Sequence, residues 1–338
     1  MVHNRRVRSA PSLTAALVVL TLASPSGGSG LPEPGTWIPS TASFVAFADL
    51  GTLLSSPALE ALETLLARRI SPDQLDTFRE LTGMDPWRDF HALSLFIGDA
   101  PESNEGTPGR ELWGVAISGG FDPERILHSI ERRLHVERRE HRETPLYVFF
   151  PGQIPGAPTG DLESHALAFP DGSTALFGSA DSVRLMLDVG LGFAPSSSGS
   201  RLQLDLDELS GCDALCLVGL GSAGIEASRR RPLGERSEMP ALRSYALSVR
   251  TGTEIRVRAR AEADSPKGAG EIADLVRGVI ALGALSPQSV SSTPALESVE
   301  IETIDERVEF SFEVDSRSLR QWLRDREKAE SSKRTTPR

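Results

Sequence analysis

Residues 245–262, YALSVRTGTEIRVRARAE, contain two alternating runs of apolar and polar residues, joined by a Thr-Gly turn at 251–252. In the second run the apolar members are Ile255, Val257, Ala259 and Ala261, and the polar members are Glu254, Arg256, Arg258, Arg260 and Glu262. A period of two residues indicates β-strands with one buried and one wet face. The stretch therefore predicts an antiparallel hairpin with a charged outer surface.

The same kind of pattern continues toward the C-terminus. Residues 269–285 predict a helix with an apolar stripe made of Ile272, Leu275, Val276, Val279 and Ile280. A last hairpin follows, with a turn near Asp305 and with Val299, Ile301, Val308, Phe310, Phe312 and Val314 facing inward. Residues 214–220 predict the strand that precedes the first hairpin, and 316–325 predict a closing helix.

The first half of the chain repeats this order of elements. Strands are expected at 43–49, 92–98, 111–118, 147–150 and around 170–172, and helices after Ser56, Ser71, Asp122 and Ser179. Hairpins divided by helices predict an α+β fold with a largely antiparallel sheet and helices packed on one face. We expect two ferredoxin-like-type structural repeats in tandem, 41–190 and 204–326, joined by a linker at 191–203. A single sheet shared by both halves fits the pattern equally well.

The first 40 residues predict export. Arg5, Arg6 and Arg8 precede the uncharged apolar run LTAALVVLTLA at 13–23, which is too short to span a bilayer but has the length of a signal-peptide core. We interpret 1–23 as a signal peptide and 24–40 as a Gly/Pro/Ser-rich linker. The expected location is the periplasm or the medium, with no stable membrane span after cleavage. The charged tail 327–338 is expected to be disordered.

Charge and cysteine content exclude several functions. The chain has a net charge of −11, and without the three arginines of the leader 33 basic residues face 47 acidic ones, a net charge of −14. Such a chain repels phosphate backbones, so nucleic-acid binding is not expected. The only cysteines are Cys212 and Cys216. In a strand their Cα atoms would lie roughly 13 Å apart, too far for a disulfide unless 211–213 turns sharply. We therefore expect Cys216 to be a small buried residue.

One glycine motif has the spacing of a dinucleotide site. Gly219, Gly221 and Gly224 match G-x-G-x-x-G after a strand. Pro232 and Gly234 would end the following helix early, however, and the surroundings indicate antiparallel hairpins instead of a parallel crossover. We interpret the motif as a Gly-rich strand exit, and we predict no cofactor.

Other reactive-looking residues have structural explanations. His135, Glu137, His141 and Glu143 would share one face of a strand, but ligands two residues apart lie nearly 7 Å apart along it. A charged edge strand explains them better than a metal site. The loop acids Asp49, Asp85, Asp89, Asp99 and Asp122 have positions suited to helix caps, and no G-x-S-x-G elbow occurs. No catalytic or metal residue is predicted.

Several turn and cap motifs carry a resemblance. They are FVAFADLGTLLSSPALEALETLL (44–66), TGMDPWRDFHALSLF (82–96), FDPER (121–125) and FPDGSTALFGSADSVRLML (169–187). Over about residues 40–190 the chain resembles a family of uncharacterised exported bacterial α+β proteins. The resemblance implies a fold and no activity, cofactor or catalytic residue.

Three functions therefore remain open. The first is a non-catalytic binding or envelope-associated protein whose ligand is an unknown protein or small molecule. The second is an enzyme, either a nucleotide-dependent oxidoreductase at Gly219–Gly224 or a hydrolase that uses loop acids. The third is a structural or assembly partner that associates through an exposed edge strand.

Overall fold

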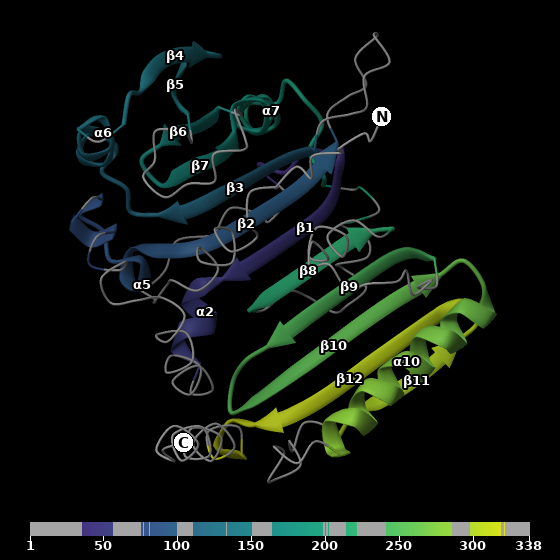
Figure 1. Cartoon of the computed structure of the whole chain (residues 1–338). Coiled ribbons are helices and arrows are strands. Elements are labelled where there is room, and N and C mark those ends of the chain that lie inside the picture. The colour runs from purple at the N-terminus through teal and green to yellow at the C-terminus, as the bar shows by residue number, and fades with distance from the viewer. Residues whose placement is uncertain are drawn as a thin grey trace, which may run out of the picture. The chain divides into compact units, whose positions relative to one another are not determined.

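The structure is a computed structural model, and Figure 1 shows its helices and strands. It describes residues 36–56, 76, 78–80, 82–99, 111–132, 134–150, 164–198, 200, 202, 214–221, 241–285, 298–318 and 321. These residues form two compact units. Unit 1 holds those within Met1–Val45 and Ile70–Ser200, and unit 2 holds those within Ala46–Arg69 and Arg201–Arg338.

Unit 1 is built on a sheet with the strand order β1-β2-β3-β7-β6-β5-β4. Its strands are β1 (Ala42–Asp49, of which the first half belongs to unit 1), β2 (Phe90–Asp99), β3 (Glu111–Gly119), β4 (Glu137–His141), β5 (Thr144–Phe149), β6 (His165–Asp171) and β7 (Thr174–Ser179). Its helices are α5 (Pro86–Asp89), α6 (Pro123–Glu131) and α7 (Ala180–Gly190). Each strand pairs antiparallel with the next along the order β2-β3-β7-β6-β5-β4.

The core of unit 1 forms where α7 packs on the sheet. Ser179 caps this helix by accepting a hydrogen bond from the Ser182 amide at 3.3 Å, and Val183, Met186 and Leu187 are fully buried. Gly114 and Gly178 lie directly opposite each other on β3 and β7. A Cβ at Gly114 would lie 2.6 Å from the Met186 sulfur, so the absence of side chains there lets α7 approach the sheet closely. Asp122 caps α6, as the sequence predicts.

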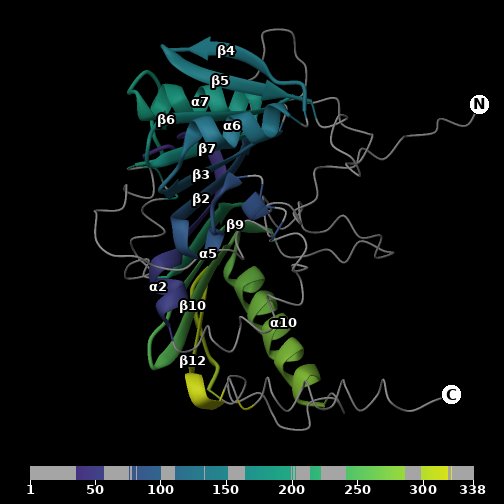
Figure 2. The ribbon, with the colours of Figure 1, turned by 90° about the vertical axis from the view of Figure 1, so that its left-hand side faces the viewer.

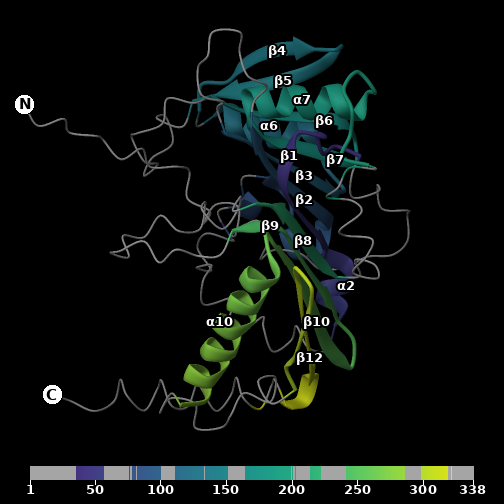
Figure 3. The same ribbon diagram turned by 90° about the vertical axis from the view of Figure 1, so that its right-hand side faces the viewer.

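Unit 2 contains a second antiparallel sheet segment with the order β8-β9-β10-β12-β11. Its elements are α2 (Leu50–Ser55), β8 (Leu215–Leu220), β9 (Leu242–Arg250), β10 (Glu254–Ala263), α10 (Pro266–Leu285), β11 (Glu300–Ile304) and β12 (Arg307–Asp315). Figure 2 and Figure 3 show α10 beside β10 and β12, on one side of these strands.

Helix α10 covers the apolar face of unit 2 with the small residues of its first turns. Ala269 and Ala273 are fully buried against Ala263 and Val308, and Ile272, Ile301 and Phe310 pack around them. The predicted apolar stripe is only partly used, because Leu275 and Val279 are 52% and 62% exposed. The charged residues of β10 lie on the other face of the sheet, since side chains alternate along a strand.

The α+β class and the antiparallel sheet confirm the sequence prediction. The described elements of unit 2 run β8-β9-β10-α10-β11-β12, and residues 222–240 between β8 and β9 lie outside the described residues, so the ferredoxin-like repeat stays a prediction. Cys216 is buried, as the sequence predicts, and it is also disulfide-bonded. Strand β8 begins at Leu215, one residue before it. Cys212 lies outside the described residues, as do residues 57–75 of the two helices predicted after Ser56 and Ser71.

Candidate functional site

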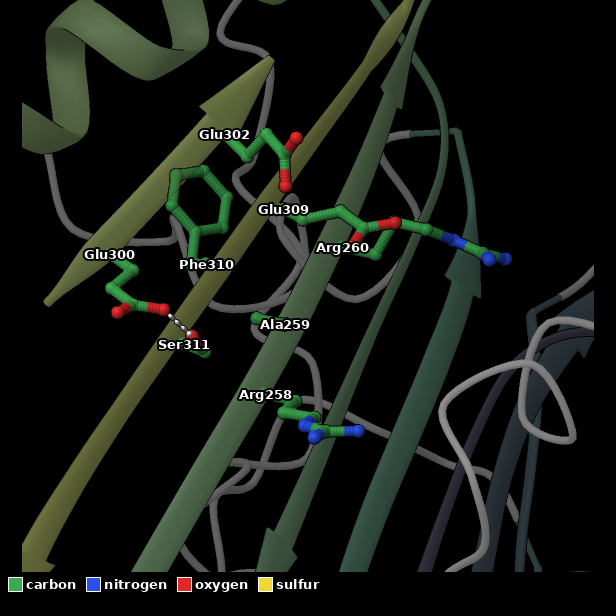
Figure 4. Close-up of a pocket in the computed structure, with 8 residues that line it drawn as sticks. All are labelled: Arg258, Ala259, Arg260, Glu300, Glu302, Glu309, Phe310 and Ser311. Atoms are coloured by element: carbon green, nitrogen blue, oxygen red, sulfur yellow. Dashed lines mark hydrogen bonds between the residues drawn. The ribbon is translucent and has the colours of Figure 1, made fainter. Parts of the chain in front are cut away.

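A hollow of about 330 Å³ opens over β10, β11 and β12 of unit 2 (Figure 4). We call it the Glu/Arg hollow after its charged residues. Its lining consists of Arg258, Ala259 and Arg260 from β10, Glu300 and Glu302 from β11, and Glu309, Phe310 and Ser311 from β12. Among these eight described residues there is no histidine and no cysteine.

The strand register explains why these side chains meet. Glu300 lies opposite Ser311, which lies opposite Arg258, and these three residues form one row across the sheet. The next row consists of Glu302, Glu309 and Arg260. All six residues share the face opposite α10, because members of one cross-strand row point the same way.

The acidic and the basic residues of the hollow come from different strands. Carboxylates occupy β11 and β12, and the two guanidinium groups come from β10, turned away from β11 toward β9 in Figure 4. Ser311 Oγ donates to a carboxylate oxygen of Glu300 at 3.5 Å. The acidic side and the basic side of the hollow could therefore hold groups of opposite charge on one ligand.

Two acids in the hollow face each other. Glu302 and Glu309 are directly opposite in the β11–β12 ladder, and like charges in that position destabilise a sheet. Arginines and acids face each other between β10 and β12: the Arg256 guanidinium donates to the Glu313 carboxylate, and Arg260 lies opposite Glu309. Glu309 has cations nearby, because Arg260 lies opposite it on β10 and Arg307 Nη1 lies 3.9 Å from its carboxylate. The described strand opposite Glu302 offers it only the acid Glu309, so a cation placed beside Glu302 would relieve the repulsion.

Arg260 gives the basic side a fixed position. This residue is only 6% exposed, which is unusual for an arginine, whereas Arg258 is exposed. A buried guanidinium keeps its five donors in one orientation with little loss of side-chain entropy when a ligand binds. The arrangement is suited to recognising a charged ligand.

Sequence reasoning identified the wet face of β10 but did not identify the hollow. The missing step was the register of the last hairpin. Its two-residue turn at Asp305–Glu306 sets Ile304 opposite Arg307, and counting outward brings Glu302 to Glu309. Asp305 adopts a positive φ of 53°, a conformation that aspartate tolerates better than most residues.

The glycine motif has a packing explanation. Strand β8 is antiparallel to β9, which is not the parallel crossover geometry of a dinucleotide fold. A Cβ at Gly219 would overlap the Tyr245 ring, and Gly221 needs its positive φ of 59°. Burial of Tyr245 against this glycine raises the pKa of its hydroxyl to about 12. Gly224 lies outside the described residues.

The histidine-rich segment forms an edge strand and a turn. His135 precedes β4, and Arg142 and Glu143 form a turn with φ angles of 51° and 64°. The predicted set of His135, Glu137, His141 and Glu143 therefore does not share one strand face. His141 Nε2 lies 3.0 Å from Asp188 Oδ1, which also accepts from Arg142 Nε at 2.9 Å. Burial alone would raise the pKa of Asp188, but the hydrogen bonds from Arg142 and His141 outweigh it and lower that pKa.

The loop acids hold local structure. Asp49 caps α2 by accepting from the Thr52 amide at 2.8 Å, and Asp122 accepts from the Arg125 amide at 3.1 Å. The Asp85 carboxylate pairs with Arg79 at 3.0 Å, and the Asp89 carboxylate accepts from the Asp85 amide at 2.7 Å. Within the described part of the chain, no three His, Cys, Asp or Glu side chains are arranged to hold a metal ion. No helix among the described residues is long and apolar enough to cross a membrane.

Comparison with known proteins adds little to this picture. No family model and no curated protein matches the sequence. Among solved structures, the chain is similar to crystal form I of TP0453, with 10% identity and a TM-score of 0.45 over 88% of this chain and 98% of that one. It is also similar to crystal form IV of TP0453, with 11% identity and a TM-score of 0.46 over 86% of this chain and 95% of that one.

Proposed function

We propose that this chain is an exported, non-catalytic binding protein whose ligand site is the Glu/Arg hollow. The observation that carries the proposal is the opposed acid pair of Glu302 and Glu309 beside a buried Arg260. Like charges directly opposite each other lower stability, and a cationic ligand beside Glu302 would offset that cost. Preorganised charges are typical of recognition sites.

Two features support the exported location. The leader at 1–23 has the basic and apolar regions of a signal peptide. The disulfide at Cys216 is favoured in an oxidising compartment and is uncommon in a reducing cytosol. The proposed membership of a family of exported α+β proteins rests on the turn and cap motifs of residues 40–190.

We also infer that the two units are structural repeats. In unit 2 the last strand, β12, pairs with the third, β10, and in unit 1 β7 pairs with β3 in the same antiparallel way. Each unit has a helix between its central hairpin and its last hairpin, α10 in one and α6 in the other. The β4–β5 hairpin is then an addition in unit 1.

Binding is tested by titrating the full chain with lysinamide, a small cation, and recording amide chemical shifts by NMR. We expect shifts at residues 258–260, 300–302 and 309–311, and their loss in the double variant Glu302→Gln/Glu309→Gln. Glu140→Gln is the matched control, since Glu140 is an exposed acid on β4 opposite Pro145. Shifts scattered over the surface, or unchanged in the double variant, would refute this site.

A further inference from the structure

The outer edge of the Glu/Arg hollow is a strand edge. Strand β11 ends the strand order of unit 2, so on its outer side no described strand pairs with it. The turn at Asp305–Glu306 makes Ile304 and Arg307 a hydrogen-bonded pair. Along a strand the backbone N–H and C=O groups of successive residues point alternately to the two sides. Those of Glu302 and Glu300 therefore point toward β12, and those of Thr303 and Ile301 point outward.

The side chains of this edge form a defined pattern. On the face of the Glu/Arg hollow β11 presents Glu300, Glu302 and Ile304 in sequence, and Ile304 is 49% exposed. On the opposite face Ile301 packs against the α10 cluster. Helix α10 therefore supports the strand from one side and leaves two acids and one apolar residue on the other side.

We propose that β11 receives an extended segment of a basic partner protein as an added β-strand. This proposal rests on the proposed function and names its ligand class. An added strand would lie about 4.8 Å from β11 and place every second side chain over the Glu/Arg hollow. Two lysines or arginines at alternate positions would face Glu300 and Glu302, and an apolar residue two positions further would cover Ile304. The recognised pattern is basic-x-basic-x-apolar in a parallel added strand and apolar-x-basic-x-basic in an antiparallel one.

The same charges determine which strands are rejected. A second copy of β11 paired antiparallel about Ile301 or Glu302 would bring acids against acids, and like charges directly opposite are unfavourable. Acidic edges thus prevent self-association of this strongly acidic protein and admit only a partner of opposite charge. The opposed carboxylates of Glu302 and Glu309 strengthen this selection, because both gain from the same cationic side chain.

The test uses a fluorescent peptide, Thr-Lys-Thr-Lys-Thr-Val-Thr with blocked ends, and the full chain in a fluorescence-anisotropy titration. The control peptide Thr-Lys-Lys-Thr-Thr-Val-Thr has the same composition but sends its lysines to opposite faces. We expect the alternating peptide to bind about tenfold more tightly, since the control loses one charged pair. Glu300→Gln/Glu302→Gln should remove that preference, and Glu140→Gln should keep it.

Backbone pairing is tested separately through Thr303→Pro. Thr303 is exposed and directs its N–H outward, so proline there removes a donor for the added strand without removing a β11–β12 bond. We expect about a tenfold loss of peptide affinity with unchanged lysinamide shifts. If this variant unfolds, a peptide N-methylated at its two inner threonines tests the same bonds with the unaltered protein.

The outcomes separate the two proposals. Lysinamide binding without preference for the alternating peptide refutes strand addition and leaves the binding site in place. Strand addition is also refuted if both peptides bind equally and neither Thr303→Pro nor N-methylation weakens their binding. Charge attraction without backbone pairing would then explain the affinity. Absence of both lysinamide and peptide binding refutes the site itself.

Discussion

Replacing Glu302 by lysine should stabilise the protein while removing its proposed ligand binding. In the β11–β12 ladder the substitution turns the acid pair Glu302/Glu309 into an opposite-charge pair. A cross-strand charge pair contributes roughly 0.2–1 kcal/mol, and here a repulsion of that size is lost while an attraction is gained. The expected gain in the free energy of unfolding is therefore about 1 kcal/mol, which corresponds to about 2–4 °C in Tm for a chain region of this size.

The assay is urea and thermal unfolding of the full chain, followed by circular dichroism at low and at high salt. Glu300→Lys is the matched control, because Glu300 lies on the same strand but opposite Ser311 and not opposite an acid. The gain from Glu302→Lys should shrink at about 1 M salt, where the screening length falls to about 3 Å. Lysinamide shifts should disappear in the variant, because the new ammonium group occupies the acidic side of the hollow.

Two results would show the reasoning to be wrong. One is a Glu302→Lys protein no more stable than Glu300→Lys, which would mean that the opposed carboxylates do not strain the empty hollow. The other is a gain in stability that salt does not reduce, which would assign the effect to packing or strand propensity instead of charge. A stability gain together with lost binding would show that the site keeps an unfavourable pair for recognition.

Three further outcomes are expected. Gly178→Ala should lower the free energy of unfolding by about 1–3 kcal/mol, because its Cβ would lie 2.5 Å from the Trp113 carbonyl oxygen, while Gly172→Ala, with open space around it, should be near neutral in the same denaturation assay. In a protein with Tyr147→Phe the phenolate absorbance of Tyr245 should rise with a midpoint at about pH 12, and stability should fall as the pH rises from about 10 toward 12, because the unfolded phenol ionises first. Alkylation under denaturing conditions should modify no thiol before reduction and two after it, since Cys216 is disulfide-bonded and the chain has two cysteines; a modified thiol in the unreduced protein would contradict the bond.

The sequence predicted the elements of the fold well because their signals are local. The alternation at 245–262 and the turn at 251–252 correspond to β9 and β10, and the Asp122-Pro123 cap begins α6 where expected. Strand order could not be predicted, since it depends on which hairpins meet after the helices. The turn at Arg142–Glu143 was also missed, because neither residue is a typical source of positive φ.

Only part of the site could be predicted for a similar reason. The charged face of β10 follows from its alternation, and the inward residues of β11 and β12 follow from theirs. The hollow itself depends on register between three strands, and a shift by one residue would place Glu302 opposite an apolar side chain. The disulfide of Cys216 depends on the path of the chain before β8, which the apolar run alone does not specify.

The split membership of β1 affects how this gene could be divided or recombined. Ala42–Val45 belongs to unit 1, whereas Ala46–Asp49 and helix α2 belong to unit 2, the rest of which begins at Arg201. In a chimaera that takes everything after Ser200 from a relative, unit 2 would therefore combine the native end of β1 and α2 with the relative's residues. Leu50 is 2% exposed, so a poorly matched neighbour would be expected to destabilise its packing. Module swapping in such proteins needs two crossovers, one within β1 and α2 and one near residue 200.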